Sequence, residues 1–92
     1  MKKARKKVTI KNTKGLHARA ANAMVLLARN FDSEITVCSE GGVCASAKST
    51  MDLLLLTASK GADIEVAAQG NDADMAVDAI SDLVDNKFNE EE

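Results

Sequence analysis

Apolar residues recur with two alternating periods along this chain of 92 residues, and this alternation limits the possible folds more than any other feature. Four segments alternate apolar and polar residues, as strands with one buried face do. Three others space apolar residues three and four positions apart, as helices with one buried stripe do. The strand segments lie at about 6–12, 34–39, 43–48 and 63–69, and the helical ones begin near Ala18, Met51 and Ala73.

The predicted order of elements is therefore β-α-β-β-α-β-α. Gly41 and Gly42 predict a tight hairpin between the second and third strands, and the second helix is short, marked by Met51, Leu54 and Leu55. One-faced strands and one-striped helices predict two layers, an antiparallel sheet covered on one side by the helices. The opposite face of the sheet should be open to water. The side chains expected there are Thr9, Thr36, Cys38, Cys44 and Ser46.

The length allows one compact domain, predicted to span residues 1–92 with an ordered core at about 6–88. Phe31 and Phe88 are the only aromatic residues, so the core must be aliphatic. This scarcity argues against modules that stack nucleic-acid bases on aromatic rings. No apolar run is long enough for a signal peptide or a membrane span, which predicts a cytoplasmic protein without a membrane partner.

Charge is distributed unevenly, although the net charge is only −2. Basic residues crowd the first seven positions, and such a run can bind nucleic acid or anionic lipid. We favour a solvated terminal segment that leads into the first strand, and expect no nucleic-acid partner. The basic residues are Lys2, Lys3, Arg5, Lys6 and Lys7, and three glutamates, Glu90, Glu91 and Glu92, close the sequence.

Two cysteines, Cys38 and Cys44, flank the predicted hairpin turn. A cytoplasmic setting predicts reduced thiols, although a cross-strand disulfide is the alternative if the turn places the two residues opposite each other. Their spacing does not match a zinc site, and the single histidine, His17, cannot complete one. We therefore expect no metal.

His17 is the candidate functional residue, because it stands between the turn at Gly15 and the start of the first helix. The first backbone N–H groups of a helix lack internal partners, so those of Ala18, Arg19 and Ala20 are expected to point at an anion on the imidazole. The helix dipole and the Arg19 guanidinium add positive charge that suits phosphate oxygens. The same field should keep the imidazole neutral, with the lone pair that a nucleophile needs.

The stretch from Lys11 to Asn30 contains no Asp or Glu. A carboxylate beside a phosphohistidine can orient water and waste the phosphoryl group, so this absence suits a carrier unless folding brings in a distant carboxylate. The alternative interpretation of His17 is an ordinary polar residue near a helix N-terminus. The surrounding string and the order of elements favour the functional interpretation.

The string from Gly15 to Ala21, Gly-Leu-His-Ala-Arg-Ala-Ala, resembles the active-site signature of the HPr family. HPr is the histidine phosphocarrier of the bacterial phosphoenolpyruvate-dependent phosphotransferase system. Residues 48–51 resemble the family's serine region, and residues 60–66 with Gly70 resemble its last strand. The resemblance covers residues 6–88, nearly the whole chain, and includes the family's nitrogen-related paralogue.

This resemblance implies an open-faced β-sandwich, in which a four-stranded antiparallel sheet carries three helices on one face. It also implies that His17, through Nδ1, accepts a phosphoryl group from enzyme I and passes it to an enzyme IIA-type acceptor, with help from Arg19. The protein would then be a monomeric carrier rather than a self-contained enzyme, and would need no cofactor. Partners would dock around the first two helices. The expected docking residues are Asn22, Ala23, Leu26, Met51 and Leu54.

The chain departs from the family pattern at three positions. Ala20 stands where many members have proline, Thr50 replaces a large aliphatic residue, and Asp52 stands where glycine is common. The residues Ala20 and Thr50 favour a regulatory branch of the system over a sugar-uptake branch.

Ser49 matches a serine that a dedicated HPr serine kinase phosphorylates in some family members. The alternative role is structural, because Ser49 and Asp52 resemble a capping box at a helix start. The Asp52 carboxylate would also repel a phosphate on Ser49.

Two classes of function fit these sequence features. The chain is either a phosphocarrier or a regulatory binding module of the same fold that docks without transferring phosphate. Labelling by enzyme I and phosphoenolpyruvate distinguishes the two.

Overall fold

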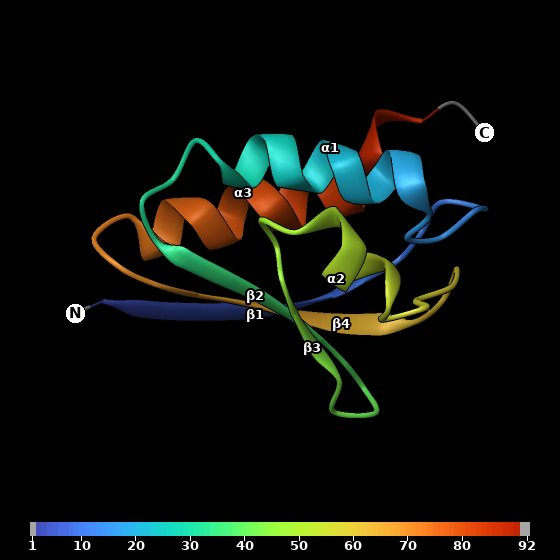
Figure 1. The fold of residues 1–92 in the computed structure, drawn as a ribbon, viewed down its shortest axis with the longest axis horizontal. Coiled ribbons are helices and arrows are strands. Elements are labelled where there is room, and N and C mark those ends of the chain that lie inside the picture. The colour runs from blue at the N-terminus through green and yellow to red at the C-terminus, as the bar shows by residue number, and fades with distance from the viewer. Residues whose placement is uncertain (1, 91–92) are drawn as a thin grey trace.

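The computed structural model describes residues 2–90, which form two layers (Figure 1). The elements follow the predicted order and end in a 3₁₀ turn, η1. They are β1 (Lys3–Thr9), α1 (Ala18–Ala28), β2 (Glu34–Ser39), β3 (Cys44–Ser46), α2 (Thr50–Leu54), β4 (Asp63–Gln69), α3 (Ala73–Asp85) and η1 (Lys87–Asn89). The predicted fold is confirmed, because four strands pair antiparallel in the order β1-β4-β2-β3 and the helices lie on one face of the sheet. Within residues 2–90, no helix has the length and apolar character needed to cross a membrane.

The core lies between the sheet and the helices, and Phe88 is its only fully buried aromatic side chain among residues 2–90. Every second residue of β4, namely Ile64, Val66 and Ala68, is buried, as the period of a strand requires. The buried residues of α3 follow the helical period, and this stripe packs on β1 and β4. The stripe consists of Ala73, Ala76, Val77, Ile80, Ser81, Leu83 and Val84.

The first strand, β1, begins at Lys3, three residues earlier than its apolar pattern indicated. Its first residues pair with the end of β4, Lys3 with Gln69 and Arg5 with Ala67, so backbone hydrogen bonding extends the strand beyond its apolar part. The basic side chains of β1 are exposed, and Val8 is its buried residue. Because β1 is an edge strand, these like charges disfavour pairing with the edge of another sheet.

The short helix α2 departs from the pattern expected of it. Met51 and Leu55, which mark this helix in the sequence, are 76% and 72% exposed, while Leu53 and the following Leu56 are buried. Leu54 is only partly buried against the core. A helix of five residues is too short for its periodicity to define a face, so packing against α1 and β3 decides which side is buried.

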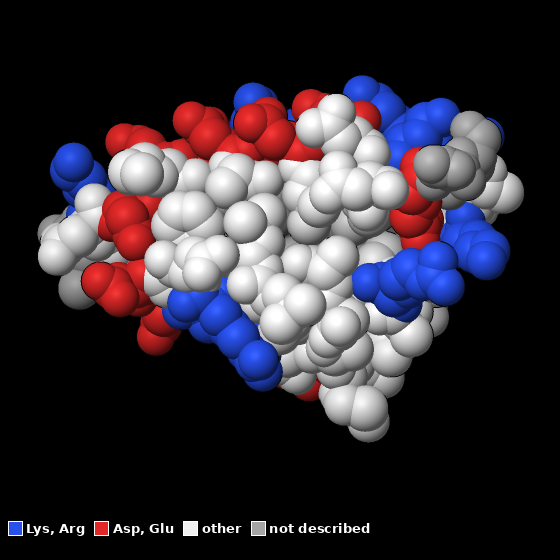
Figure 2. Space-filling model, turned by 90° about the horizontal axis from the view of Figure 1, so that it is seen from above, with Lys and Arg blue, Asp and Glu red and all other residues white. Residues whose placement is uncertain are grey.

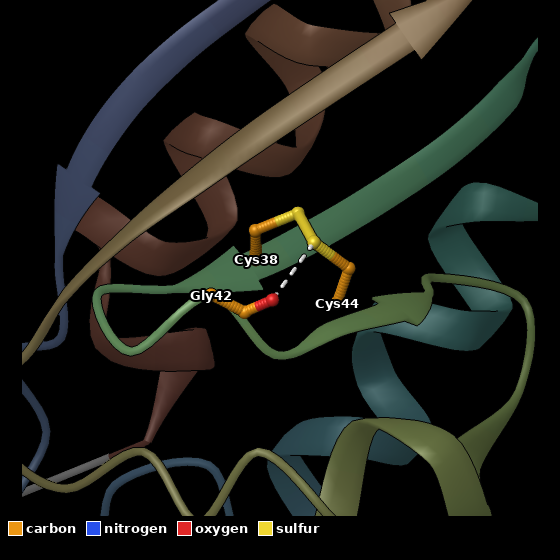
Figure 3. The surroundings of a disulfide bond; sticks show 3 residues. All are labelled: Cys38, Gly42 and Cys44. Atoms are coloured by element: carbon orange, nitrogen blue, oxygen red, sulfur yellow. Dashed lines mark hydrogen bonds between the residues drawn. A yellow bond between two sulfur atoms is a disulfide. The ribbon is translucent and has the colours of Figure 1, made fainter.

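Cys38 and Cys44 form a disulfide across the β2–β3 hairpin (Figure 3). They are direct partners in the antiparallel register, with their Cα atoms 4.0 Å apart. The turn closes because the Ser39 N–H donates to the Val43 carbonyl and the Gly42 N–H donates to the Ser39 carbonyl. The Cys44 sulfur lies 3.8 Å from the Gly42 carbonyl oxygen. The prediction of reduced thiols is therefore wrong for this structure. The turn places the two cysteines directly opposite each other, which is the arrangement that the sequence gave as the alternative.

Asp72 connects the start of α3 to the loop before β2. Its carboxylate accepts hydrogen bonds from the N–H groups of Asp32 and Ser33, at 2.9 and 3.0 Å, and from the Ser33 hydroxyl. The Ser33 hydroxyl, followed by the Asp32 N–H, lowers the pKa of Asp72 below its ordinary value of 3.8. A lowered pKa in the folded state means that the carboxylate stabilises the fold fully above pH 3.8. This contribution is lost as the pH falls through the lowered pKa.

We expect Asp72→Asn to lower the melting temperature at pH 7, because the amide is a weaker acceptor for three donors. The difference from the wild type should shrink as the pH falls below 3.8, where the wild-type carboxylate also loses its charge. Thermal melts followed by circular dichroism over this pH range measure it. Asp78→Asn, which removes the same charge from an exposed position of α3, should change little. A difference in melting temperature between Asp72→Asn and the wild type that stays the same at every pH would contradict this account.

Candidate functional site

Hydrogen bonds that converge on Gly15 fix the loop between β1 and α1. The Gly15 N–H donates to the Asn12 carbonyl at 3.1 Å, and the Asn12 side-chain amide donates back to the Gly15 carbonyl at 2.7 Å. Gly15 has a φ of +65°, in the left-handed region that glycine adopts at little cost. The next residue, Leu16, is buried and its N–H donates to the Ala58 carbonyl at 2.9 Å. His17 therefore follows an anchored segment of backbone.

His17 is the N-cap of α1, with extended backbone angles of φ −87° and ψ −178°. Its Nδ1 atom accepts a hydrogen bond from the Arg19 N–H at 3.4 Å, and its carbonyl accepts one from the Ala21 N–H at 2.8 Å. The side chain keeps 26% of its area exposed. The imidazole thus lies where the sequence placed it, at the start of a helix and in contact with solvent.

The backbone N–H groups of Ala18, Arg19 and Ala20 lie in the first turn of α1, where a helix offers them no carbonyl partners. This turn contains no acidic side chain. Arg19 is exposed, and its guanidinium forms no ion pair with any carboxylate of residues 2–90. The turn therefore combines the positive end of the helix dipole with an available guanidinium, an arrangement that suits an oxyanion.

A carboxylate contacts the other ring nitrogen. Glu90 Oε2 lies 2.6 Å from His17 Nε2, and the Glu90 side chain is only 12% exposed. Because Nδ1 accepts the Arg19 N–H, we assign the ring proton to Nε2, which donates it to Glu90. The absence of Asp and Glu from residues 11–30 therefore does not extend to the folded site: folding brings in a distant carboxylate, the alternative that the sequence left open, because Glu90 is 73 residues away in the sequence.

Asn12 organises the site, although the sequence marks it only as a turn residue. Its side chain is completely buried, and Nδ2 donates both to the Gly15 carbonyl at 2.7 Å and to Glu90 Oε1 at 2.9 Å. Its Oδ1 atom has no hydrogen-bond partner among the described residues. Buried amide donors need hydrogen-bond partners, and Asn12 Nδ2 finds them in the loop and in Glu90. Asn12 thereby connects the loop to the carboxylate. No local sequence pattern reveals this, because a turn asparagine is usually exposed.

Known proteins match almost the whole chain. Residues 4–86 match the family model described as the PTS HPr component phosphorylation site. The chain is 49% identical to phosphocarrier protein NPr from Shewanella violacea, over 98% of both sequences. It is 40% identical to phosphocarrier protein HPr from Xylella fastidiosa, over 91% of this chain and 93% of that one. Its structure matches the crystal structure of HPr-C-His from Thermoanaerobacter tengcongensis with a TM-score of 0.87 and 38% identity, over the full length of both.

The chain belongs to the HPr family. The resemblance seen in the sequence is thereby confirmed, and so is the open-faced fold that it implied. Membership supports a phosphocarrier role in the phosphotransferase system. It also implies interaction, in general terms, with enzymes I and IIA of that system.

The expected docking residues of this HPr-family protein lie on α1 and α2, which pack against each other. Figure 2 shows that the middle of the helical face lacks charged side chains, while acidic and basic side chains both lie around it, the acidic ones most densely along the upper edge. Of the expected residues, Asn22, Leu26 and Met51 are exposed, and Ala23 and Leu54 are partly buried. Leu55, which follows directly after α2 and is 72% exposed, is a further exposed apolar residue outside the predicted set.

Ser49, the match to the HPr family's serine, caps α2. Its Oγ accepts a hydrogen bond from the Asp52 N–H at 3.2 Å. Only half of the expected capping box forms, because the Ser49 N–H donates to the Ser46 carbonyl at 3.1 Å. The cap by itself accounts for a serine here, and phosphorylation of Ser49 stays a prediction.

Proposed function

We propose that this protein carries a phosphoryl group on Nδ1 of His17, accepting it from enzyme I and passing it to an enzyme IIA-type acceptor. The main support is the position of Nδ1, which accepts the Arg19 N–H at 3.4 Å and therefore has its lone pair at the N-terminus of α1. A histidine needs such a lone pair to attack phosphorus. The end of the helix then stabilises the anion that the attack creates.

The proposed reaction is an in-line displacement at phosphorus. The Nδ1 lone pair forms the new N–P bond while the bond from phosphorus to the donor breaks, and that bond's electron pair stays with the donor. The N–H groups of Ala18, Arg19 and Ala20 and the guanidinium of Arg19 stabilise the phosphoryl oxygens. The onward transfer repeats these steps with His17 as the leaving group. The partner enzymes supply the phosphoenolpyruvate site and the metal, so this chain needs no cofactor of its own.

We also propose that the protein is a monomer in the cytoplasm and that both partner enzymes bind to one surface of it. That surface comprises Asn22, Ala23, Leu26, Met51 and Leu54. The residues Ala20 and Thr50 favour a regulatory branch over sugar uptake. We retain Ser49 as a candidate site for an HPr serine kinase, although the Asp52 carboxylate lies on the same turn and disfavours added negative charge there.

Incubation with enzyme I and radiolabelled phosphoenolpyruvate tests the proposed function. We expect about one phosphoryl group per chain, on a bond that is labile in acid and stable in alkali, as a phosphohistidine is. Addition of an enzyme IIA-type acceptor should then discharge the label. The absence of any label on the folded wild-type protein would overturn the proposal.

The second candidate is the binding module that docks without phosphotransfer. The exposed apolar residues of α1 and α2 favour docking as such, whether or not phosphate moves. An unlabelled protein that still binds the partner enzymes in a pull-down would support this candidate.

A further inference from the structure

We propose that Glu90 is a positioning residue for the phosphotransfer, which holds the proton of His17 on Nε2 and so directs the phosphoryl group to Nδ1. This inference rests on the proposed role of His17. It gives a function to a carboxylate that the proposed reaction does not otherwise use.

Both carboxylate oxygens of Glu90 have partners at the site. Oε2 lies 2.6 Å from His17 Nε2, and Oε1 accepts the Asn12 amide at 2.9 Å. The same Asn12 nitrogen donates to the Gly15 carbonyl at 2.7 Å, in the loop that leads to His17. Because the Glu90 side chain is only 12% exposed, water competes little for it. Asn12 therefore holds the carboxylate by one oxygen, and the other oxygen faces the ring.

An unusual turn brings Glu90 to this position. Lys87, Phe88 and Asn89 have φ values of +57°, +55° and +61°, in the left-handed region that residues with side chains rarely adopt. Phe88 anchors the turn in the core, where it is 4% exposed, and the Glu90 N–H donates to the Lys87 carbonyl at 3.0 Å. Backbone strain of this kind persists only where surrounding contacts maintain it, and it concentrates at functional sites.

The contact controls which ring nitrogen attacks phosphorus. A neutral imidazole carries its proton on one nitrogen, and the hydrogen bond made there leaves the other nitrogen with the free lone pair. An ionised carboxylate only accepts hydrogen bonds, so Glu90 requires the proton on Nε2. The Arg19 N–H at Nδ1 only donates, so it requires the same arrangement. The two contacts together leave Nδ1 as the nucleophile.

The same carboxylate suits the phosphorylated state. When Nδ1 forms the N–P bond and Nε2 keeps its proton, the ring gains positive charge, which the negative Glu90 stabilises. When the next acceptor attacks phosphorus, the electron pair of the N–P bond returns to Nδ1 and the ring leaves neutral. Glu90 is hydrogen-bonded to Nε2 and not to Nδ1, the nitrogen that bears the phosphoryl group. It is therefore aimed away from the position where a carboxylate would direct water at phosphorus.

Glu90→Ala tests the proposal through NMR of the imidazole nitrogens and through the site of phosphorylation. In the unphosphorylated wild type we expect the proton on Nε2 alone, and in the variant a mixture of both tautomers. Phosphoramidate, a small phosphoryl donor that needs no enzyme I, should then phosphorylate the wild type at Nδ1 and the variant at both nitrogens. The rate of phosphorylation by enzyme I should fall about tenfold in the variant, as expected when a residue that orients a reacting ligand is lost.

Two further variants separate this role from a structural one. Glu90→Gln keeps the size of the side chain but has one acceptor oxygen for two donors, Asn12 Nδ2 and His17 Nε2, so the preference for a proton on Nε2 should weaken as in Glu90→Ala. Glu34→Ala removes one exposed carboxylate at the start of β2 and should change neither the tautomer nor the phosphorylation site. Circular dichroism establishes that each variant is folded. An unchanged tautomer and an unchanged phosphorylation site in Glu90→Ala would overturn the proposal.

Failure of the carrier function would give a different result. The tautomer measurement uses unphosphorylated protein, so it is independent of enzyme I and of any phosphoryl transfer. A wild type that takes no label from enzyme I rejects the proposed function. The tautomer shift in Glu90→Ala then still decides whether Glu90 positions the imidazole.

Discussion

His17→Ala is expected to abolish labelling by enzyme I and phosphoenolpyruvate while the protein stays folded. His17 is the only histidine of the chain, so no other imidazole can take its place. Loss of a nucleophile should reduce the rate by more than about a thousandfold, which in this assay means no detectable label. The variant also loses the contact between Nδ1 and the Arg19 N–H at the start of α1, which should cost about 1 kcal/mol of stability.

His17→Asn provides the matched control for this prediction. Asparagine is a good N-cap, so the variant should recover the stability that alanine loses. Its amide nitrogen has no lone pair free to attack phosphorus, so it should remain unlabelled. Label retained by either variant would assign the phosphoryl group to another residue and exclude the mechanism proposed for Nδ1.

Gly15→Ala is expected to destabilise the fold by about 3 kcal/mol, combining backbone strain with overpacking. Gly15 has a φ of +65°, which is unfavourable for alanine. A Cβ atom on Gly15 would also lie 2.5 Å from the Ala58 carbonyl oxygen and 3.0 Å from Ser59 Cα, both backbone atoms that cannot rotate away. The loop must then shift, and the hydrogen bond from Leu16 to Ala58 should weaken. Because His17 follows directly, labelling by enzyme I should slow as well.

Gly42→Ala separates the two contributions to this effect. Gly42 has a φ of +89°, but a Cβ atom there meets no atom within 4 Å. We expect a loss of only about 1 kcal/mol, since backbone strain acts alone. Denaturant unfolding of the two variants and the wild type measures the difference. Equal losses in the two variants would mean that the close approach of Gly15 to Ala58 contributes nothing.

The order of elements and the position of the candidate histidine were predictable from the sequence. The bounds 34–39 and 63–69 match β2 and β4 as the structure has them, and α1 begins at Ala18 as expected. These features depend on residues that are near neighbours in the chain, because apolar periodicity reports the local backbone geometry directly. For the same reason the sequence located His17 at a helix N-terminus before any tertiary contact was known.

The features that the sequence missed depend on register or on distant contacts. Which side of α2 is exposed follows from its packing against α1 and β3. The disulfide follows from the hairpin register, which Gly41 and Gly42 alone do not determine. The early start of β1 follows from pairing with β4, which supplies backbone partners regardless of side-chain polarity.

The sequence by itself determined the layers, the helix start and the histidine at that start. The tertiary structure alone decided what surrounds the ring. Glu90 is 73 residues from His17, and a left-handed turn anchored by Phe88 brings it to Nε2. Asn12 becomes a buried link between Glu90 and the Gly15 carbonyl for the same reason. Local patterns carry no information about such contacts, because these depend on how the whole chain packs and not on the spacing of neighbouring residues.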